Sequence, residues 1–169
     1  ADIGIVAAMV DMAGLETRPF RTDRFVLVTA PSHALEGSSR VAFADTLEHD
    51  FVGLDRTSAL QRFLSEKAAE AGRHLKLRVQ LRSFDAVCRL VECNVGIGIV
   101  PMSTALRQAK TMAIRPAELS DAWAVRRLTI CVRREAELPV YARELFHHLA
   151  HSAGSATPLR SSPLQAGEG

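Results

Sequence analysis

The chain has 169 residues, 47% of them apolar and 24% charged, and carries a formal net charge of +2. This balance is typical of a globular protein that buries a sizeable core, and the small charge gives no support for nucleic-acid binding by this chain alone. No run of about 18 apolar residues predicts a membrane span, and no signal peptide opens the chain.

The amino-terminal third contains three short apolar runs that are typical of buried strands. Gly14 marks a turn after the first run, Pro31 ends the second, and residues 32–40 form a polar loop. We therefore expect strands over residues 3–6, 25–29 and 51–54.

A helix is predicted immediately after the third strand, capped by Thr57 or Ser58. Ser58 and Gln61 fit a capping box, in which the serine hydroxyl and the glutamine amide each satisfy a free backbone N–H group. Apolar residues then recur at helical spacing, and Gly72 provides a left-handed stop. The apolar face consists of Leu60, Phe63, Leu64 and Ala71.

Residues 75–81 alternate apolar and polar side chains, which predicts a strand with one face in water. Ser83 caps the next predicted helix, and Gly96 and Gly98 end it. The apolar run over residues 97–100 then leads into Pro101 as a short buried strand. The apolar face of the helix consists of Phe84, Val87, Cys88, Val91 and Val95.

The last third predicts a short helix over residues 102–109, strands over 112–115 and 127–132, and a final helix over 139–150. The inner face of that final helix consists of Leu145, Phe146 and Leu149. Residues 152–169 are rich in Ser, Ala, Gly and Pro and predict a disordered tail. Strands that alternate with helices indicate an α/β fold with a mostly parallel sheet, in which ligands bind at the carboxyl ends of strands.

The three cysteines, Cys88, Cys93 and Cys131, form no C-x-x-C pair. Their odd number and the apolar segments around them indicate buried, reduced thiols in a cytoplasmic protein. Five positions would place Cys88 and Cys93 on different faces of one helix, so we expect no disulfide between them.

The sequence gives no positive support for an enzyme, because it has no G-x-S-x-G, P-loop or paired Cys/His nucleophile pattern. Gly96-Ile97-Gly98 follows a helix and opens a strand, which is the reverse of a dinucleotide fingerprint, so we interpret it as a helix stop. We expect no catalytic residue and no cofactor.

A cluster of histidines near the carboxyl end has two interpretations. His147 and His151 lie four positions apart, beside Glu144 and His148, and that spacing suits a metal ion. No H-E-x-x-H motif is present, and the cluster borders the predicted tail. A solvated helix face is the better interpretation, and we expect no metal.

The strongest constellation is the strand-to-helix junction over residues 54–58. The hydroxyls of Thr57 and Ser58, beside the free N–H groups of a helix start, suit a carboxylate or a similar anion, and they equally suit simple capping. Ser83 and Phe84 repeat this arrangement at a second junction. If both junctions faced one cleft, they would make a small anion pocket.

Taken together, several segments resemble the substrate-binding domain of LysR-type transcription regulators. The similarity covers residues 1–150, and the order and spacing of the segments are more specific than any one of them. The matching segments are Ala1-Asp2-Ile3-Gly4-Ile5-Val6, Leu15-Glu16 with Pro19-Phe20, Phe25-Val26-Leu27-Val28, Pro31-x-His33-x-Leu35, Val41-x-x-x-Asp45-x-Leu47 with Phe51-Val52, and Val91-x-x-x-Val95-Gly96-Ile97-Gly98-Ile99-Val100-Pro101.

The resemblance implies a fold like that of the type 2 periplasmic-binding proteins, with two α/β subdomains joined by crossover strands. Residues 22–124 would form the second subdomain. Residues 1–21 and 125–151 would form part of the first, because the family's opening strand and helix have no counterpart here. We therefore expect this chain to be an amino-terminally truncated effector domain, with both the family's usual dimer and a complete pocket in question.

By position, the resemblance implies an effector in the cleft between the subdomains, with Arg56 and Arg82 as possible charge partners for an acidic effector. The implied effector-binding residues are Ala7, Ala8, Thr57, Ser58, Ser83, Phe84, Ile99, Val100 and Pro101.

The implied function is the sensing of a small, anionic metabolite by a cytoplasmic, homo-oligomeric regulator. Promoter DNA would be bound only through a winged helix-turn-helix domain that this chain lacks. The alternative is a solute-binding protein of a transport system, which would share the fold.

Overall fold

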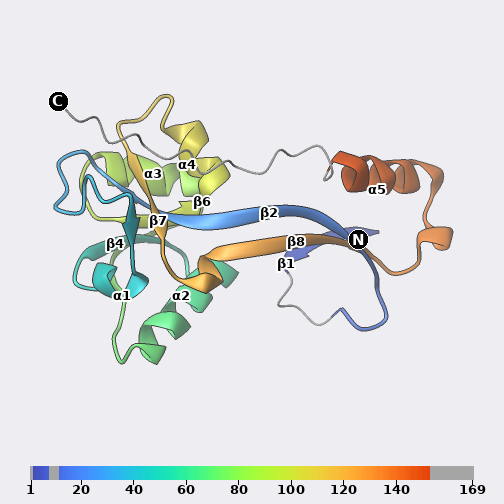
Figure 1. The fold of residues 1–169 in the computed structure, drawn as a ribbon, viewed down its shortest axis with the longest axis horizontal. Helices are drawn as coiled ribbons and strands as arrows, with labels where there is room; N and C mark the ends of the chain where they lie inside the picture. Colours follow the sequence, from blue (N-terminus) through green and yellow to red (C-terminus); the bar gives the residue numbers. More distant parts are fainter. Residues whose placement is uncertain (1, 8–11, 153–169) are drawn as a thin grey trace, which may run out of the picture. The chain divides into compact units, whose positions relative to one another are not determined.

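The structure, a computed structural model, describes residues 2–7 and 12–152 (Figure 1). Strands and helices alternate along most of the chain. In chain order the elements are β1 (Ile3–Ala7), β2 (Glu16–Thr29), β3 (Arg40–Val41), α1 (Phe43–Thr46), β4 (Asp50–Leu54), α2 (Ala59–Glu70), β5 (Lys76–Leu81), α3 (Phe84–Glu92), β6 (Gly98–Pro101), α4 (Met102–Gln108), β7 (Arg115–Leu119), η1 (Ala122–Ala124), β8 (Val125–Val132), η2 (Glu135–Glu137) and α5 (Val140–Ser152).

The chain divides into two compact units. Unit 1 consists of Ala1–Arg21 and Arg127–Gly169, and unit 2 is Thr22–Arg126. Strands β2 and β8 each contribute residues to both units. The chain therefore passes between the units twice.

Unit 2 is a sheet covered by helices on both faces. Phe25, Leu27 and Ile99 belong to one buried cluster, and Val26, Val28 and Val100 to another. Successive residues of a strand point to opposite faces, so the two clusters lie on the two sides of the sheet. Helices α1 and α2 supply the first cluster, and α3 and α4 the second, as Figure 1 shows below and above the strands.

Strand pairing in unit 2 mixes both directions. Strand β2 pairs with β6 and with β7 in antiparallel register, whereas β7 pairs with β3, and β4 with β5, in parallel. In unit 1, β1 pairs with β8 antiparallel, from Ile3 opposite Val132 to Ala7 opposite Leu128. The prediction of a mostly parallel sheet is therefore wrong, because the long ladders on β2 and β8 are antiparallel.

The core of unit 1 lies between its strands and α5. Phe146 of α5 is fully buried and packs with Phe20, Ile130 and Val132. Leu145 is 50% exposed, so its predicted place on the inner face of the helix is wrong. The prediction of a disordered tail falls outside the described residues, apart from Ser152, which ends α5.

Three predicted boundaries are also wrong. Strand β2 begins at Glu16 rather than at residue 25, and β7 begins at Arg115 rather than at residue 112. Helix α3 ends at Glu92, well before Gly96, because Asn94 adopts a left-handed conformation with φ 55°. The N–H of Val95 then donates to the carbonyl of Leu90 (3.1 Å), which closes the helix as a Schellman motif.

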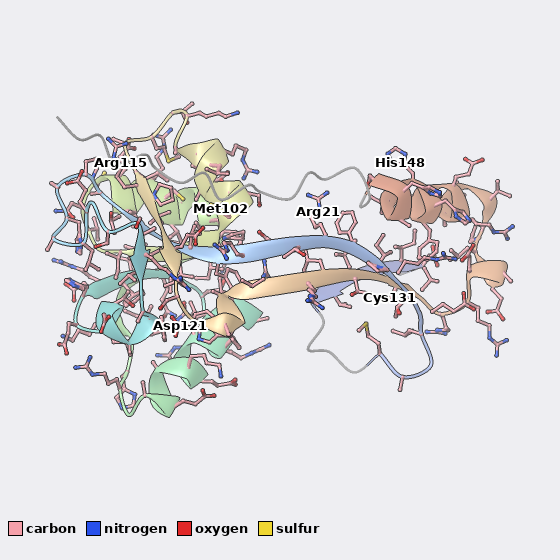
Figure 2. All side chains as sticks on the ribbon, viewed as in Figure 1. Arg21, Met102, Arg115, Asp121, Cys131 and His148 are labelled. Atoms are coloured by element: carbon pink, nitrogen blue, oxygen red, sulfur yellow. The ribbon has the colours of Figure 1, made fainter. Side chains whose placement is uncertain are left out.

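The short helix α1 illustrates how distant segments fix local structure. It has no side-chain cap of its own. Instead the carboxylate of Asp121, labelled in Figure 2, accepts a hydrogen bond from the N–H of Phe43 at 2.8 Å. A carboxylate at a helix start satisfies a free N–H and complements the helix dipole.

Candidate ligand-binding edge of unit 2

Three strand-to-helix junctions lie at one edge of unit 2. Strands β4 and β5 run parallel with Leu54 opposite Leu81, and the N–H of Asp55 donates to the carbonyl of Leu81 at 2.8 Å. A parallel bridge between Phe51 and Ile97 orients β6 in the same direction. The junctions that start α2, α3 and α4 therefore all follow the carboxyl ends of these strands.

Ser58 and Ser83 cap the helices that follow them, as predicted. The Ser58 hydroxyl accepts from the N–H of Gln61 at 3.5 Å, and the Ser83 hydroxyl accepts from the N–H of Ala86 at 3.2 Å. Neither hydroxyl proton has an acceptor among the described residues. Both hydroxyls thus keep one donor available for a ligand.

Thr57 differs, because its donors are already engaged. Its N–H donates to Asp55 Oδ1 at 2.9 Å, and its hydroxyl donates to the same oxygen. These bonds, together with the nearby Arg82 guanidinium, lower the pKa of Asp55 from its usual value. The carboxylate is therefore ionised at neutral pH, and a ligand anion has to displace it to reach the donors of Thr57.

The two arginines of this edge are exposed. Arg82 acts on Asp55 through its charge. Arg56 forms no ion pair with any residue that the structure describes. Both side chains are thus available for an acidic ligand.

The residues of β6 are placed differently from the serines. Ile99 is 5% exposed and Val100 is fully buried, on opposite faces of the sheet. Both residues therefore belong to the core, and neither presents a side chain to a ligand. Phe84 and Pro101 are half-buried, and Phe84 packs against the cluster that contains Val100.

The remaining predicted site residues belong to unit 1. Ala7 ends β1 opposite Leu128. Ala8 lies outside the described residues. The structure therefore brings together the predicted residues of unit 2 only.

The capping box predicted for Ser58 and Gln61 is half wrong. The N–H of Ser58 donates to the carbonyl of Asp55 at 3.1 Å, so the Gln61 amide does not take it. The Gln61 side chain is instead buried, at 3% exposure. The D-x-T pattern over residues 55–57 is a turn signal, and it indicates that Asp55 accepts hydrogen bonds from Thr57.

In the histidine cluster, His147 and His151 make polar contacts with other residues of unit 1. His147 Nε2 lies 2.9 Å from Glu135 Oε1, and His151 Nδ1 lies 2.7 Å from the carbonyl of His147. Across residues 2–7 and 12–152, no group of three or more His, Cys, Asp or Glu side chains is arranged to hold a metal ion. Within the same residues no helix is long and apolar enough to cross a membrane.

The cysteines are free thiols. Cys88 and Cys131 are buried, as predicted, whereas Cys93, the residue after the end of α3, is exposed, so its predicted burial is wrong. Burial raises the pKa of the Cys88 thiol to about 11, and the Asp85 carboxylate adds to the shift.

Comparison with known proteins establishes the class and then the family. Solved structures with the same fold include the regulatory domain of CcmR from Synechocystis PCC6803 in complex with 2-PG, which matches with a TM-score of 0.79 at 16% identity over 92% of this chain and 74% of that one. The effector binding domain of QuiR in complex with shikimate matches with a TM-score of 0.71 at 19% identity, over 92% of this chain and 73% of that one. The class is thus the α/β fold of the type 2 periplasmic-binding proteins.

The sequence profile of the LysR substrate binding domain matches residues 1–154, and the chain belongs to that family. The family is regulatory rather than enzymatic.

Curated relatives carry the name "Probable RuBisCO transcriptional regulator". The one from Emiliania huxleyi is 23% identical over 164 residues, which cover 91% of this chain and 52% of the relative. The one from Cyanidioschyzon merolae (strain NIES-3377 / 10D) is 24% identical over 108 residues, which cover 62% of this chain and 36% of the relative. The chain thus spans about half or less of their length, and their class favours regulation over the transport alternative.

Proposed function

We propose that this chain is the small-molecule sensor of a LysR-type transcription regulator. The observation that carries the proposal is the alignment of three strand-to-helix junctions at one edge of unit 2, within a domain of the LysR substrate-binding family. In open α/β sheets, ligands bind outside the carboxyl ends of the strands. The CcmR and QuiR domains, which share the fold, are complexes with small molecules.

Unit 2 and unit 1 would correspond to the second and first regulatory subdomains of the family. On this basis the effector would contact the hydroxyls of Ser58 and Ser83 and the exposed part of Phe84. The full proposed set remains Ala7, Ala8, Thr57, Ser58, Ser83, Phe84, Ile99, Val100 and Pro101, of which Ile99 and Val100 are buried.

The proposed effector is small and acidic. Arg56 and Arg82 supply the positive charge, and the free hydroxyl protons of Ser58 and Ser83 supply donors. Asp55 opposes an anion, because its ionised carboxylate holds both donors of Thr57. Binding an acidic effector at Thr57 would therefore release Asp55 towards solvent or towards an arginine.

In the whole protein, we propose a homo-oligomeric regulator that acts in the cytoplasm and contacts promoter DNA through a separate winged helix-turn-helix domain. The curated relatives named as transcriptional regulators support this part of the proposal. Effector binding would then shift the population of regulator states rather than start a chemical reaction.

A thermal-shift screen of organic acids tests the sensor proposal. A binder present at about 100 times its Kd stabilises the domain by about 2.7 kcal/mol, which raises the melting temperature measurably. Thr57→Val should reduce this shift at a cost in stability of about 1 kcal/mol, since it removes one hydrogen bond.

Thr111→Val is the matched control, because Thr111 is exposed and lies outside the three junctions. Its response should equal that of the wild type. An acid that stabilises Thr57→Val as strongly as the wild type would show that Thr57 is not part of the site. Silence of the folded domain across the whole panel would contradict an acidic effector.

A further inference from the structure

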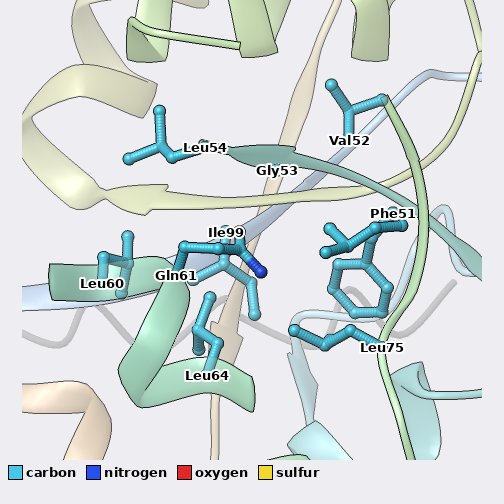
Figure 3. Close-up of a pocket in the computed structure, with 10 residues that line it drawn as sticks. Phe51, Val52, Gly53, Leu54, Leu60, Gln61, Leu64, Leu75 and Ile99 are labelled. Atoms are coloured by element: carbon cyan, nitrogen blue, oxygen red, sulfur yellow. The ribbon is translucent and has the colours of Figure 1, made fainter. Parts of the chain in front are cut away.

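A small cavity lies beneath the first turns of α2 (Figure 3). Its volume is about 10 Å³. Apart from Gln61, the side chains that line it are apolar, and they come from β4, α2, β6, β5 and the residue before β5. They include Leu54, Leu60, Leu64, Leu77 and Ile99.

One polar side chain is directed into this apolar cavity. Gln61 is 3% exposed, and its Nε2 group has no hydrogen-bond partner among the described residues. Figure 3 shows the carboxamide among the cavity-lining side chains. A buried donor without an acceptor is strongly disfavoured, so native proteins satisfy nearly all such groups with protein atoms or ordered water.

The pairing between β4 and β6 ends beside this cavity. Strands β4 and β6 are joined by a single parallel bridge between Phe51 and Ile97, where the N–H of Val52 donates to the carbonyl of Ile97 at 2.8 Å. No further bridge joins these two strands within residues 12–152. Beyond the bridge their facing edges no longer pair with each other, and the cavity lies there, beside Gly53 and Ile99. Backbone groups on these edges are the further polar partners that a buried water needs.

Gly53 is the residue that makes room for the carboxamide. A Cβ atom at this position would lie 2.5 Å from Gln61 Oε1 and 2.7 Å from Leu77 Cδ2. The glutamine therefore lies flat against the backbone of β4. Any larger residue at position 53 would push it out of place.

The size of the cavity decides what it can hold. A cavity must have a volume of about 10–15 Å³ to hold one water molecule. With about 10 Å³, this cavity admits one water and is too small for a metabolite. We infer that this cavity is a specific site for a single ordered water, which accepts a hydrogen bond from Gln61 Nε2 and bridges the edges of β4 and β6 where their ladder ends.

The test is solution NMR of the isotopically labelled chain. In the wild type, the side-chain NH₂ protons of Gln61 and the methyl groups of Leu77 should show cross-peaks to one long-lived water. Gln61→Met keeps the length of the side chain and removes the donor, so the cross-peak to Leu77 should disappear. Gln80→Met is the matched control, because Gln80 is exposed, donates to the carbonyl of Leu54 at 3.2 Å, and does not line the cavity.

Two outcomes would overturn the inference. Absence of any long-lived water beside Gln61 in the folded wild type would show that the site is empty. Persistence of the water in Gln61→Met would show that Gln61 does not hold it. If Gln61→Met fails to fold, Gly53→Ala provides the second variant, and its folded form should have lost the cross-peak to Leu77.

Discussion

Gly96 lies where its backbone closely approaches that of Asp50. A Cβ atom there would lie 2.5 Å from the carbonyl oxygen of Asp50 and 3.1 Å from its carbonyl carbon. Carbon and oxygen atoms normally stay about 3.3 Å apart even in weak hydrogen bonds, so Gly96→Ala forces the strands to separate by roughly 0.8 Å.

That separation acts on the two bonds that join β4 to the segment before β6. The N–H of Ile97 donates to the Asp50 carbonyl at 2.8 Å, and the N–H of Val52 donates to the Ile97 carbonyl at 2.8 Å. Weakening them costs about 1 kcal/mol each, and overpacking adds about 1–3 kcal/mol. We expect Gly96→Ala to lower the free energy of unfolding by about 3–5 kcal/mol.

Urea unfolding followed by tryptophan fluorescence measures this loss. The single tryptophan, Trp123, lies in the same unit, with its ring 5.3 Å from the rings of Phe43 and Phe63. The midpoint should fall without a change in the slope of the transition, which indicates a change in stability alone.

Gly72→Ala is the control, because it replaces a glycine by alanine without the steric clash expected at Gly96. Gly72 has φ +68° and open space around it, so the substitution costs only about 1–2 kcal/mol of backbone strain. If Gly96→Ala destabilised the protein less than Gly72→Ala does, the reasoning from close backbone approach would be refuted.

Other expected outcomes follow from burial and capping. Phe146→Ala should lower the free energy of unfolding, measured by thermal unfolding, by about 3–5 kcal/mol, because Phe146 is fully buried. Leu145→Ala, at a half-exposed position, should lower it by under about 1 kcal/mol. Equal losses would contradict the packing of α5. Ser83→Ala should cost about 1 kcal/mol in urea unfolding through loss of the α3 cap, and an unchanged midpoint would contradict that role. Iodoacetamide treatment of the native protein at pH 8, followed by mass spectrometry, should find Cys93 modified and Cys88 protected. The reason is that the Cys88 thiol is buried and its pKa is raised to about 11. Rapid alkylation of Cys88 would contradict its burial.

Elements defined by local pattern were predictable from the sequence. Residues 75–81 alternate strictly, and residues 76–81 form β5 with alternating exposed and half-buried side chains. Ser58 and Ser83 cap α2 and α3, and Gly72 adopts the left-handed conformation after α2. Capping and turn preferences depend on a few neighbouring residues, so they can be read without knowledge of the rest of the chain.

Elements defined by distant partners were not predictable. The first part of β2 has exposed polar residues and no apolar period, and it is a strand because its backbone pairs with a neighbouring strand. Helix α3 ends at Glu92, closed by the left-handed Asn94, although Gly96 offered a stronger sequence signal. Gly96 is required instead for close approach to Asp50.

For the candidate site, the sequence by itself determined which residue types stand at the strand-to-helix junctions, and its segments determined the family. Only the tertiary structure decided what those groups do. It buries Ile99 and Val100 in the core, and it leaves the Gln61 side chain with an unpaired donor in a cavity. The physical reason is that a polar group's behaviour depends on the partners and burial around it, and most of those partners come from distant parts of the chain.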